Sequence, residues 1–204
     1  SVLLIPSKPL PLKNQSSDYI VNLSTAAIQD GHFIFPLATK HLMCGEEKLS
    51  RLALSIAIVE NYFRGNIRRK VEILYAQFVL AFEDKLPAIS LGLTQLGPEA
   101  ARNGLTNLVS NNTMPPISDH DLFRLIIADH SNLILAYGYL DHLKTKLFIS
   151  QLNQDTIKQL AQRYNSKTSN MQSNLYALMV YHIYQHQALI GRFTSKQCGY
   201  VLEL

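Results

Sequence analysis

No stretch of the chain is long and apolar enough to predict a membrane span. A spanning helix needs about 20 consecutive apolar residues, and the longest candidate, residues 126–140, is interrupted by the polar run 129–132. Cysteine is also scarce, because Cys44 and Cys198 are the only two and they lack metal-ligand spacing. One disulfide and two reduced thiols both stay open, and we favour the reduced pair.

Motifs of several enzyme classes are absent as well. The sequence has no phosphate-binding glycine loop, no nucleophile elbow of the Gly-x-Ser-x-Gly type and no cysteine–histidine pair at a recognised spacing. His182 and His186 have the i, i+4 spacing that places two imidazoles on one helix face, but the zinc-protease glutamate and a clear third ligand do not accompany them. We therefore expect surface histidines, no metal site and no cofactor.

The composition is that of a folded protein with one domain. Apolar residues make up 47% of the 204 residues and charged residues 17%, which is too apolar for disorder. The net charge of +4 favours a polyanionic partner, and nucleic acid, anionic lipid and bacterial cell wall all qualify. Residues 1–6 lack the basic start of a secretory signal, so we expect that an export signal has been removed or is not used.

The chain divides into two parts by pattern. Residues 1–45 contain early prolines and a polar stretch at 13–18 and show no sustained helical period, which predicts an extended arm packed on the domain. From residue 46 the apolar residues follow helical spacing, which predicts a helix over 46–63. A second helix is predicted over 66–82, and Pro87 blocks its continuation.

The predicted 66–82 helix has two unlike sides. One side carries apolar residues, namely Ile67, Val71, Tyr75, Phe78, Val79 and Phe82. The other side carries charged residues, namely Arg68, Arg69, Lys70 and Glu72. Such a pattern is typical of an amphipathic helix.

Four later helices complete the expected fold, over 98–110, 118–147 with a break near Asp129, 155–164 and 171–190. Residues 111–116 predict a loop, and Ser118 followed by Asp121 predicts a helix N-cap with an acid at its third position. No strand alternation supports a large sheet. The expected fold class is mainly α, with an arm over 1–45 and a helical domain over 46–204.

Glu60 is the most informative residue, because it lies on the apolar side of its own helix, one turn after Ile56 and one turn before Arg64. A carboxyl group in a partly dry cleft has a raised pKa, as a general acid at neutral pH needs. The alternative is a buried carboxylate in a structural ion pair with Arg64 or Arg68.

Four segments, in this order, resemble the motifs of the lytic transglycosylases and goose-type lysozymes, the family-23 glycosidases. They are ALSIAIVE (53–60), SLGLTQLGPEAA (90–101), DHSNLILAYGYL (129–140) and LAQRYN (160–165). The resemblance covers roughly residues 46–190, and its most specific part is the second segment. It implies a lysozyme-like helical fold and a single catalytic carboxyl group, that of Glu60.

The resemblance also implies the other site residues. Glu60 would protonate the glycosidic oxygen, Gln95 and the backbone near Ser90 and Gly92 would hold the sugar, and Tyr164 would stand close to Glu60. Asn165 completes the substrate-binding set that the last motif implies.

The chain departs from the family pattern at several positions. Asn61 stands where relatives usually carry Ser, which weakens any bracing role for that position. Thr94, Arg163 and Ser166 replace the usual Met, Ala and Gly. The long interval between Glu60 and Gln95 predicts that the 66–82 helix is an elaboration near the cleft.

Other acidic residues are candidates for the second carboxylate that most glycosidases use, namely Glu72, Glu83, Asp84, Asp119 and Asp121. Each has a simpler interpretation, either on a charged helix face or at a helix end, where the dipole favours acids in the first turn. Among the tyrosines, Tyr176, Tyr181 and Tyr184 are expected to be partly core, and Tyr164 is preferred for substrate contact.

The expected function is therefore cleavage of the β-1,4 bond between N-acetylmuramic acid and N-acetylglucosamine in peptidoglycan. The expected location is the periplasm or the extracellular cell wall, with no nucleic-acid partner and with an immunity or inhibitor protein as a candidate partner. The basic run 68–70 is expected to be a solvated helix face, with attraction to acidic stem peptides as the alternative. The competing function is a non-catalytic helical module that binds cell wall or a protein.

Overall fold

The computed structural model describes residues 17–42, 45–109, 117–165 and 170–193. Cys44, Cys198 and the predicted loop at 111–116 lie outside the described residues. The described residues form helices and turns and contain no β-strand, apart from one isolated antiparallel bridge between Leu91 and Leu96. The expected mainly α class is confirmed.

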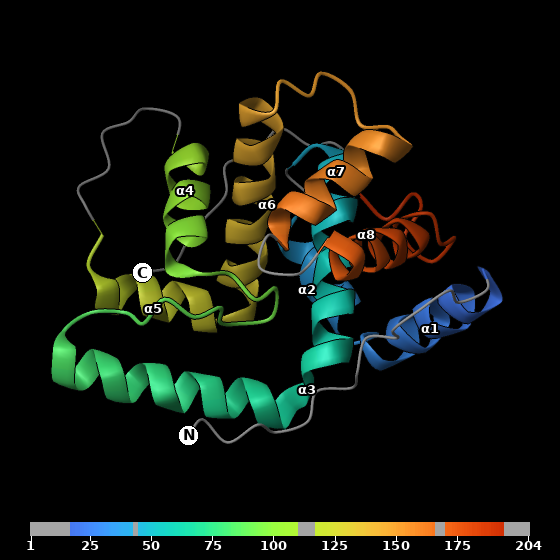
Figure 1. The fold of residues 1–204 in the computed structure, drawn as a ribbon. Coiled ribbons are helices and arrows are strands. Elements are labelled where there is room, and N and C mark those ends of the chain that lie inside the picture. Colours follow the sequence, from blue (N-terminus) through green and yellow to red (C-terminus); the bar gives the residue numbers. More distant parts are fainter. Residues whose placement is uncertain (1–16, 43–44, 110–116, 166–169, 194–204) are drawn as a thin grey trace.

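Eight helices make up this part of the chain (Figure 1). They are α1 (Ser17–Asp30), α2 (Ile34–His41), α3 (Glu47–Glu83), α4 (Pro98–Leu108), α5 (Asp119–Ile127), α6 (Asp129–Lys146), α7 (Gln154–Tyr164) and α8 (Asn170–Tyr184). None of these helices combines the length and the apolar character that crossing a bilayer would require.

Helix α3 contains both helices that the sequence predicts over 46–63 and 66–82. Its helical backbone is broken at Gly65, whose φ of 63° and ψ of 163° are not helical. A residue with a Cβ avoids this conformation, whereas glycine adopts it readily. The two halves of α3 therefore meet at a steep angle, one passing through the middle of the molecule and the other lying along its edge (Figure 1).

The first half of α3 is the centre of the fold. Residues 52–61 are buried on every side, and α3 packs mainly against α1, α2, α6 and α8, with a smaller contact to α5. A helix that is surrounded in this way must be apolar all round, and the segment 53–59 satisfies this condition apart from Ser55, whose hydroxyl donates to the Arg51 carbonyl at 2.7 Å. Glu60 follows at the end of this apolar segment.

The expectation of an extended arm is wrong for residues 17–41, which form α1 and α2. The missed signal is the i, i+3, i+4, i+7, i+8 spacing of five inward residues of α1: Ile20, Leu23, Ser24, Ala27 and Ile28. Small and polar neighbours hide this period in the sequence. The packing of α1 on α3 and α8 supplies the stabilisation that a marginal helix of this length lacks alone.

The later helices follow the predictions with one difference at the C-terminal end. The break in the 118–147 region falls at Ala128, and the Asp121 amide donates to the Ser118 hydroxyl at 3.1 Å, as the predicted N-cap requires. Helix α8 ends at Tyr184 rather than near residue 190. His182 and His186 therefore do not share one continuous helix, and the His186 ring accepts a hydrogen bond from the Ala188 amide.

Helices α4 and α6 cross at very short range because glycine lies on both sides of the contact. A Cβ on Gly104 would come within 2.4 Å of the Leu135 carbonyl oxygen, and a Cβ on Gly138 within 2.4 Å of the Gly104 carbonyl oxygen. This close approach holds the middle of α4 against the middle of α6. These are two of the elements that line the cleft described next.

Two hydrophobic cores underlie the cleft. The first core surrounds the first half of α3, and the second core contains Ala76 and Leu80 from its second half. Tyr139 and Tyr164 pack against both cores. The seam between the cores therefore runs beneath these two tyrosines.

Candidate active site

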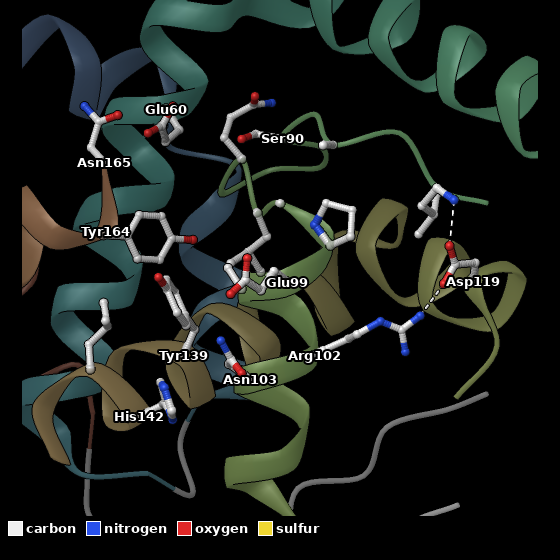
Figure 2. Close-up of a pocket in the computed structure, with 18 of the residues that line it drawn as sticks. Glu60, Ser90, Glu99, Arg102, Asn103, Asp119, Tyr139, His142, Tyr164 and Asn165 are labelled. Atoms are coloured by element: carbon white, nitrogen blue, oxygen red, sulfur yellow. Dashed lines mark hydrogen bonds and ion pairs between the residues drawn. The ribbon is translucent and has the colours of Figure 1, made fainter. Parts of the chain in front are cut away.

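A cleft of about 850 Å³ lies at this seam. Its walls come from the middle of α3, the loop 85–97, the start of α4, the C-terminal half of α6 and the end of α7. The cleft contains five of the six predicted site residues, namely Glu60, Ser90, Gln95, Tyr164 and Asn165 (Figure 2). Its volume lies within the range of small-ligand sites.

The carboxyl group of Glu60 is nearly enclosed but reaches the cleft. Its residue is 9% exposed and lines the cleft wall. The Tyr176 hydroxyl, from α8, donates a hydrogen bond of 2.9 Å to Oε1 of Glu60. The second carboxyl oxygen is not engaged in this hydrogen bond.

Burial raises the pKa of Glu60 from 4.5 to about 7. The positive charge of Arg64 and the hydrogen bond from Tyr176 lower this pKa in part, and the negative charge of Glu72 raises it. Loss of solvation is the largest effect because the ionised form loses more hydration than its neighbours replace. At neutral pH a large fraction of Glu60 is protonated, so this group can donate a proton near neutrality.

The two arginines considered as ion-pair partners of Glu60 bind a different acid. Arg64 and Arg68 both contact Oε1 of Glu72, at 2.6 Å and 3.0 Å. Glu72 thus holds one arginine from each side of the Gly65 break. Glu72 therefore forms the ion pair with both arginines, and the charge of Arg64 acts on Glu60 by lowering its pKa.

The loop carrying Gln95 is a tight turn closed by the Leu91–Leu96 bridge. Asn132, which is fully buried at the start of α6, accepts hydrogen bonds from the amide and hydroxyl of Thr94, both at 2.7 Å. Its amide nitrogen donates to the Ile126 carbonyl at 2.8 Å. Asn132 therefore fixes the turn to the start of α6, which explains why an asparagine stands in the first turn of this helix.

Gln95 lies at the cleft with a left-handed backbone, φ 56°. Its Nε2 donates to the Gly92 carbonyl at 3.0 Å and lies 3.4 Å from Oε2 of Glu72. Its Oε1 is buried and has no hydrogen-bond partner within the described part of the chain. Since an unpaired buried acceptor is costly, this oxygen is a polar atom of the turn whose hydrogen-bonding capacity is unused.

Gly92 is the predicted site residue that the structure does not place on the cleft wall. A Cβ at this position would lie 2.2 Å from Nδ2 of Asn132 and 2.3 Å from the Ile126 carbonyl oxygen, and its φ is 77°. Glycine is needed here for the turn and for close packing. Its contribution to the site is to shape the turn that holds Gln95.

Aromatic rings form one wall of the cleft (Figure 2). The Tyr139 and Tyr164 rings lie 5.6 Å apart, and the His142 ring stacks on Tyr139 at 6.3 Å. The Tyr164 hydroxyl donates to the Thr94 carbonyl at 3.0 Å, and burial raises the pKa of Tyr164 well above its usual range. The phenol is therefore neutral and fixed, and the negative charge of Glu60 adds to the rise in its pKa.

Several residues of the site escaped the sequence reasoning. Tyr176 belongs to the core, as expected, and it also donates a hydrogen bond to Glu60. Tyr139, His142 and Lys146 share one face of α6, and their i, i+3, i+7 spacing was a usable signal. Which face of α6 borders a cleft depends on the packing of α4 and α7, so the spacing alone did not identify them.

Four of the five acidic candidates for a second catalytic carboxylate, Glu72 among them, have structural partners within the described residues. Asp119 binds Arg102 and accepts the Leu86 amide at 2.6 Å (Figure 2). Asp84 pairs with His120, and Asp121 contacts Ser118. Glu99, which was not among the candidates, lines the cleft from the first turn of α4.

The basic run 68–70 does not line the cleft. Arg68 pairs with Glu72, Arg69 contacts Asn66, and Lys70 is exposed. The cations on the cleft wall are instead Arg64, Lys85, Arg102 and Lys146. Of these four, Arg64 and Arg102 are paired with Glu72 and Asp119.

No protein-family model, curated protein or solved structure matches the chain. The site is therefore interpreted through its own geometry and chemistry.

Proposed function

We propose that the protein cleaves peptidoglycan glycan strands as a glycosidase of the lytic transglycosylase type, with a lysozyme-like fold and Glu60 as its catalytic acid. The observation that carries this proposal is a nearly enclosed carboxyl group with a pKa of about 7 on the wall of an open cleft. A carboxyl group of this kind suits proton donation to a glycosidic oxygen near neutral pH.

In the proposed reaction the carboxyl group of Glu60 acts first as an acid and then as a base. Glu60 gives its proton to the oxygen between N-acetylmuramic acid and N-acetylglucosamine, and the bond from that oxygen to C1 of the muramic residue breaks. The resulting carboxylate then takes the proton of the C6 hydroxyl of the same muramic residue, and that oxygen bonds to C1. The products are a 1,6-anhydro-muramic end and a free 4-hydroxyl on the leaving sugar, so protons and bonds balance without a second carboxylate.

The cleft supplies groups that suit a sugar substrate. Apolar sugar faces stack on aromatic rings, and Tyr139 and Tyr164 offer such a surface beside Glu60. The unpaired Oε1 of Gln95 can accept a hydroxyl or amide proton from the sugar. The cationic residues of the wall suit the carboxylates of the stem peptides.

The location and partners follow from this substrate. Peptidoglycan lies in the periplasm or at the cell surface, so the protein acts there, and an immunity or inhibitor protein would bind the same cleft. Neither a nucleic acid nor a cofactor is part of this proposal.

The test is mass spectrometry of the soluble muropeptides released from purified peptidoglycan. Wild-type protein is expected to release anhydro-muramic products, and Glu60→Gln is expected to lower release by at least a hundredfold. Glu47→Gln is the matched control, because Glu47 lies in the first turn of the same helix and pairs with Arg51 away from the cleft.

Two outcomes would change the proposal. Products with a reducing end would assign a lysozyme reaction with water. Glu99 and Glu72 would then be the candidates for the group that activates this water. A folded protein that binds the glycan without release would support the binding module instead.

A further inference from the structure

The second half of α3 exposes a continuous line of large apolar side chains, which we call the outer stripe. Its members and their exposed fractions are Ile67 (70%), Val71 (42%), Leu74 (64%), Tyr75 (51%), Phe78 (62%) and Phe82 (75%). At 100° per residue these positions fall within a single arc of the helix. The Phe78 and Phe82 rings also contact one another, with centroids 4.5 Å apart.

If this helix packed only within its own chain, its largest apolar side chains would face the core, whereas those of the outer stripe face solvent. The inward side of this helix meets the second core through Ala76 and Leu80, with Ile73 partly buried. The largest apolar residues therefore face away from the body. Single exposed apolar residues are normal, whereas a contiguous exposed patch marks an interaction surface.

The spacing of the stripe is the same in both directions along the helix. Ile67 and Phe82, Val71 and Phe78, and Leu74 and Tyr75 are placed symmetrically about a point between residues 74 and 75. If a second copy lies antiparallel with the same midpoint, Phe82 meets Ile67 and Phe78 meets Val71. Each large ring then faces a smaller aliphatic side chain, and every contact occurs twice, as a two-fold interface requires.

The charges at the two ends of this helix are opposite in sign. Residues 68–70 form a basic start, and Glu83 and Asp84 form an acidic end. Antiparallel pairing brings the basic start of one copy beside the acidic end of the other, and it also aligns the helix dipoles favourably. A parallel pairing would place like charges together.

We propose that the outer stripe is the contact surface of a symmetric, antiparallel dimer of this chain. The self-complementary spacing and the end charges favour a second copy over any other occupant. This interface lies on the side of α3 that points away from the second core, and it is independent of the proposed reaction.

Sedimentation velocity of the full chain tests the dimer. The expected mass is twice the monomer mass of 23.0 kDa. Phe78→Asp places a charge at the stripe without touching either core, and it is expected to weaken association by at least a hundredfold. Phe148→Asp is the matched control, because Phe148 is 94% exposed and lies outside the stripe. Circular dichroism checks that both variants are folded.

Disulfide trapping tests the antiparallel register, in a background where Cys44 and Cys198 are replaced by serine. Leu74→Cys lies beside the two-fold axis and is expected to crosslink to its own copy on mild oxidation. Ile67→Cys in the antiparallel dimer lies about 20 Å from its own copy, at ~1.5 Å per residue, and is expected not to crosslink. A parallel dimer would crosslink at both positions.

Three results would overturn the proposal. They are a monomer at all accessible concentrations, a dimer that Phe78→Asp leaves intact, and efficient crosslinking of Ile67→Cys. A monomer that co-sediments with anionic phospholipid vesicles, and loses this binding with Phe78→Asp, would assign the stripe to a membrane surface. Muropeptide release by the Phe78→Asp variant separates this result from a failure of the proposed function.

Discussion

The hydroxyl of Tyr176 on α8 donates a hydrogen bond to Oε1 of Glu60 on α3. These residues are 116 positions apart, so this bond forms only when α8 packs against the central helix. The phenol supports the ionised form of the carboxyl group, whereas burial opposes it. The pKa of Glu60 therefore depends on the packing of α8 against α3, which supplies the hydrogen bond from Tyr176.

Glu60→Gln is expected to stabilise the protein at alkaline pH. Because the folded-state pKa of about 7 exceeds the ordinary 4.5, the folded protein holds a proton that the unfolded chain releases between these pH values. Wild-type stability therefore falls as pH rises through this window, by about 3 kcal/mol at 1.36 kcal/mol per pKa unit. The variant should lack this loss, so its advantage in urea denaturation should be larger at pH 8.5 than at pH 4. A structural ion pair at Glu60 predicts the opposite, a less stable variant at pH 8.5.

Tyr176→Phe is expected to raise the pKa of Glu60 further. The lost hydrogen bond stabilised the ionised form, so the carboxyl group should stay protonated to higher pH. The alkaline limb of the pH profile of muropeptide release should move upward. Tyr181→Phe is the control, because the Tyr181 hydroxyl contacts only Gln185 in the hydrogen bonds described for it. An unchanged or lowered limb would contradict the assignment.

Gln95→Ala is expected to reduce release at least tenfold with little loss of stability. Its Nε2 bonds to the Gly92 carbonyl within the turn and makes a longer contact with Oε2 of Glu72, and its Oε1 is a buried acceptor without a partner. Gln77→Ala on the exposed part of α3 should leave release unchanged. Equal losses in both variants would remove Gln95 from the substrate contacts.

Asn132→Ala is expected to destabilise the fold by about 2–4 kcal/mol, because it leaves the Thr94 amide and the Ile126 carbonyl buried without partners. Asn107→Ala removes a half-buried bond to Asp141 and should cost about 1 kcal/mol. Thermal unfolding distinguishes them. Similar melting temperatures for the two variants would show that Asn132 does not anchor the turn.

Gly92→Ala is expected to cost more than 3 kcal/mol, and Gly65→Ala about 1–2 kcal/mol. Both glycines have positive φ, but only Gly92 lacks room for a Cβ. The comparison separates backbone strain from crowding. Equal losses in urea denaturation would mean that the contacts with Asn132 and Ile126 relax easily.

The sequence was sufficient to predict a structural feature wherever a strong local pattern determines that feature. Glu60 was placed on a buried helix face because Ile56 and Ala57 precede it at helical spacing, and Ser118 marked a helix start through its own hydrogen bond. Helix α1 was missed because Ser24 and Ala27 weaken its apolar stripe. In these helices, the sequence alone predicts the buried face or the first residue only where the side chains are large and apolar or form an N-cap hydrogen bond.

Tertiary packing decided the rest. The sequence showed that the 66–82 helix has an apolar side, but a period does not say which way that side points, and the side that packs is built from Ala76 and Leu80. Tyr176 could not be paired with Glu60 because their contact depends on the docking of α8. The cleft lining on α6 depends likewise on the crossing with α4 through Gly104.

One helix supplies side chains to both cores, since α3 contributes its first half to one and Ala76 and Leu80 to the other. The relative placement of the two cores is thus governed by helical rise and by the change of direction at Gly65, instead of by a connecting loop. Gly65 lies between the segment that carries Glu60 and the segment that carries the outer stripe, so its backbone angles set the orientation of one toward the other.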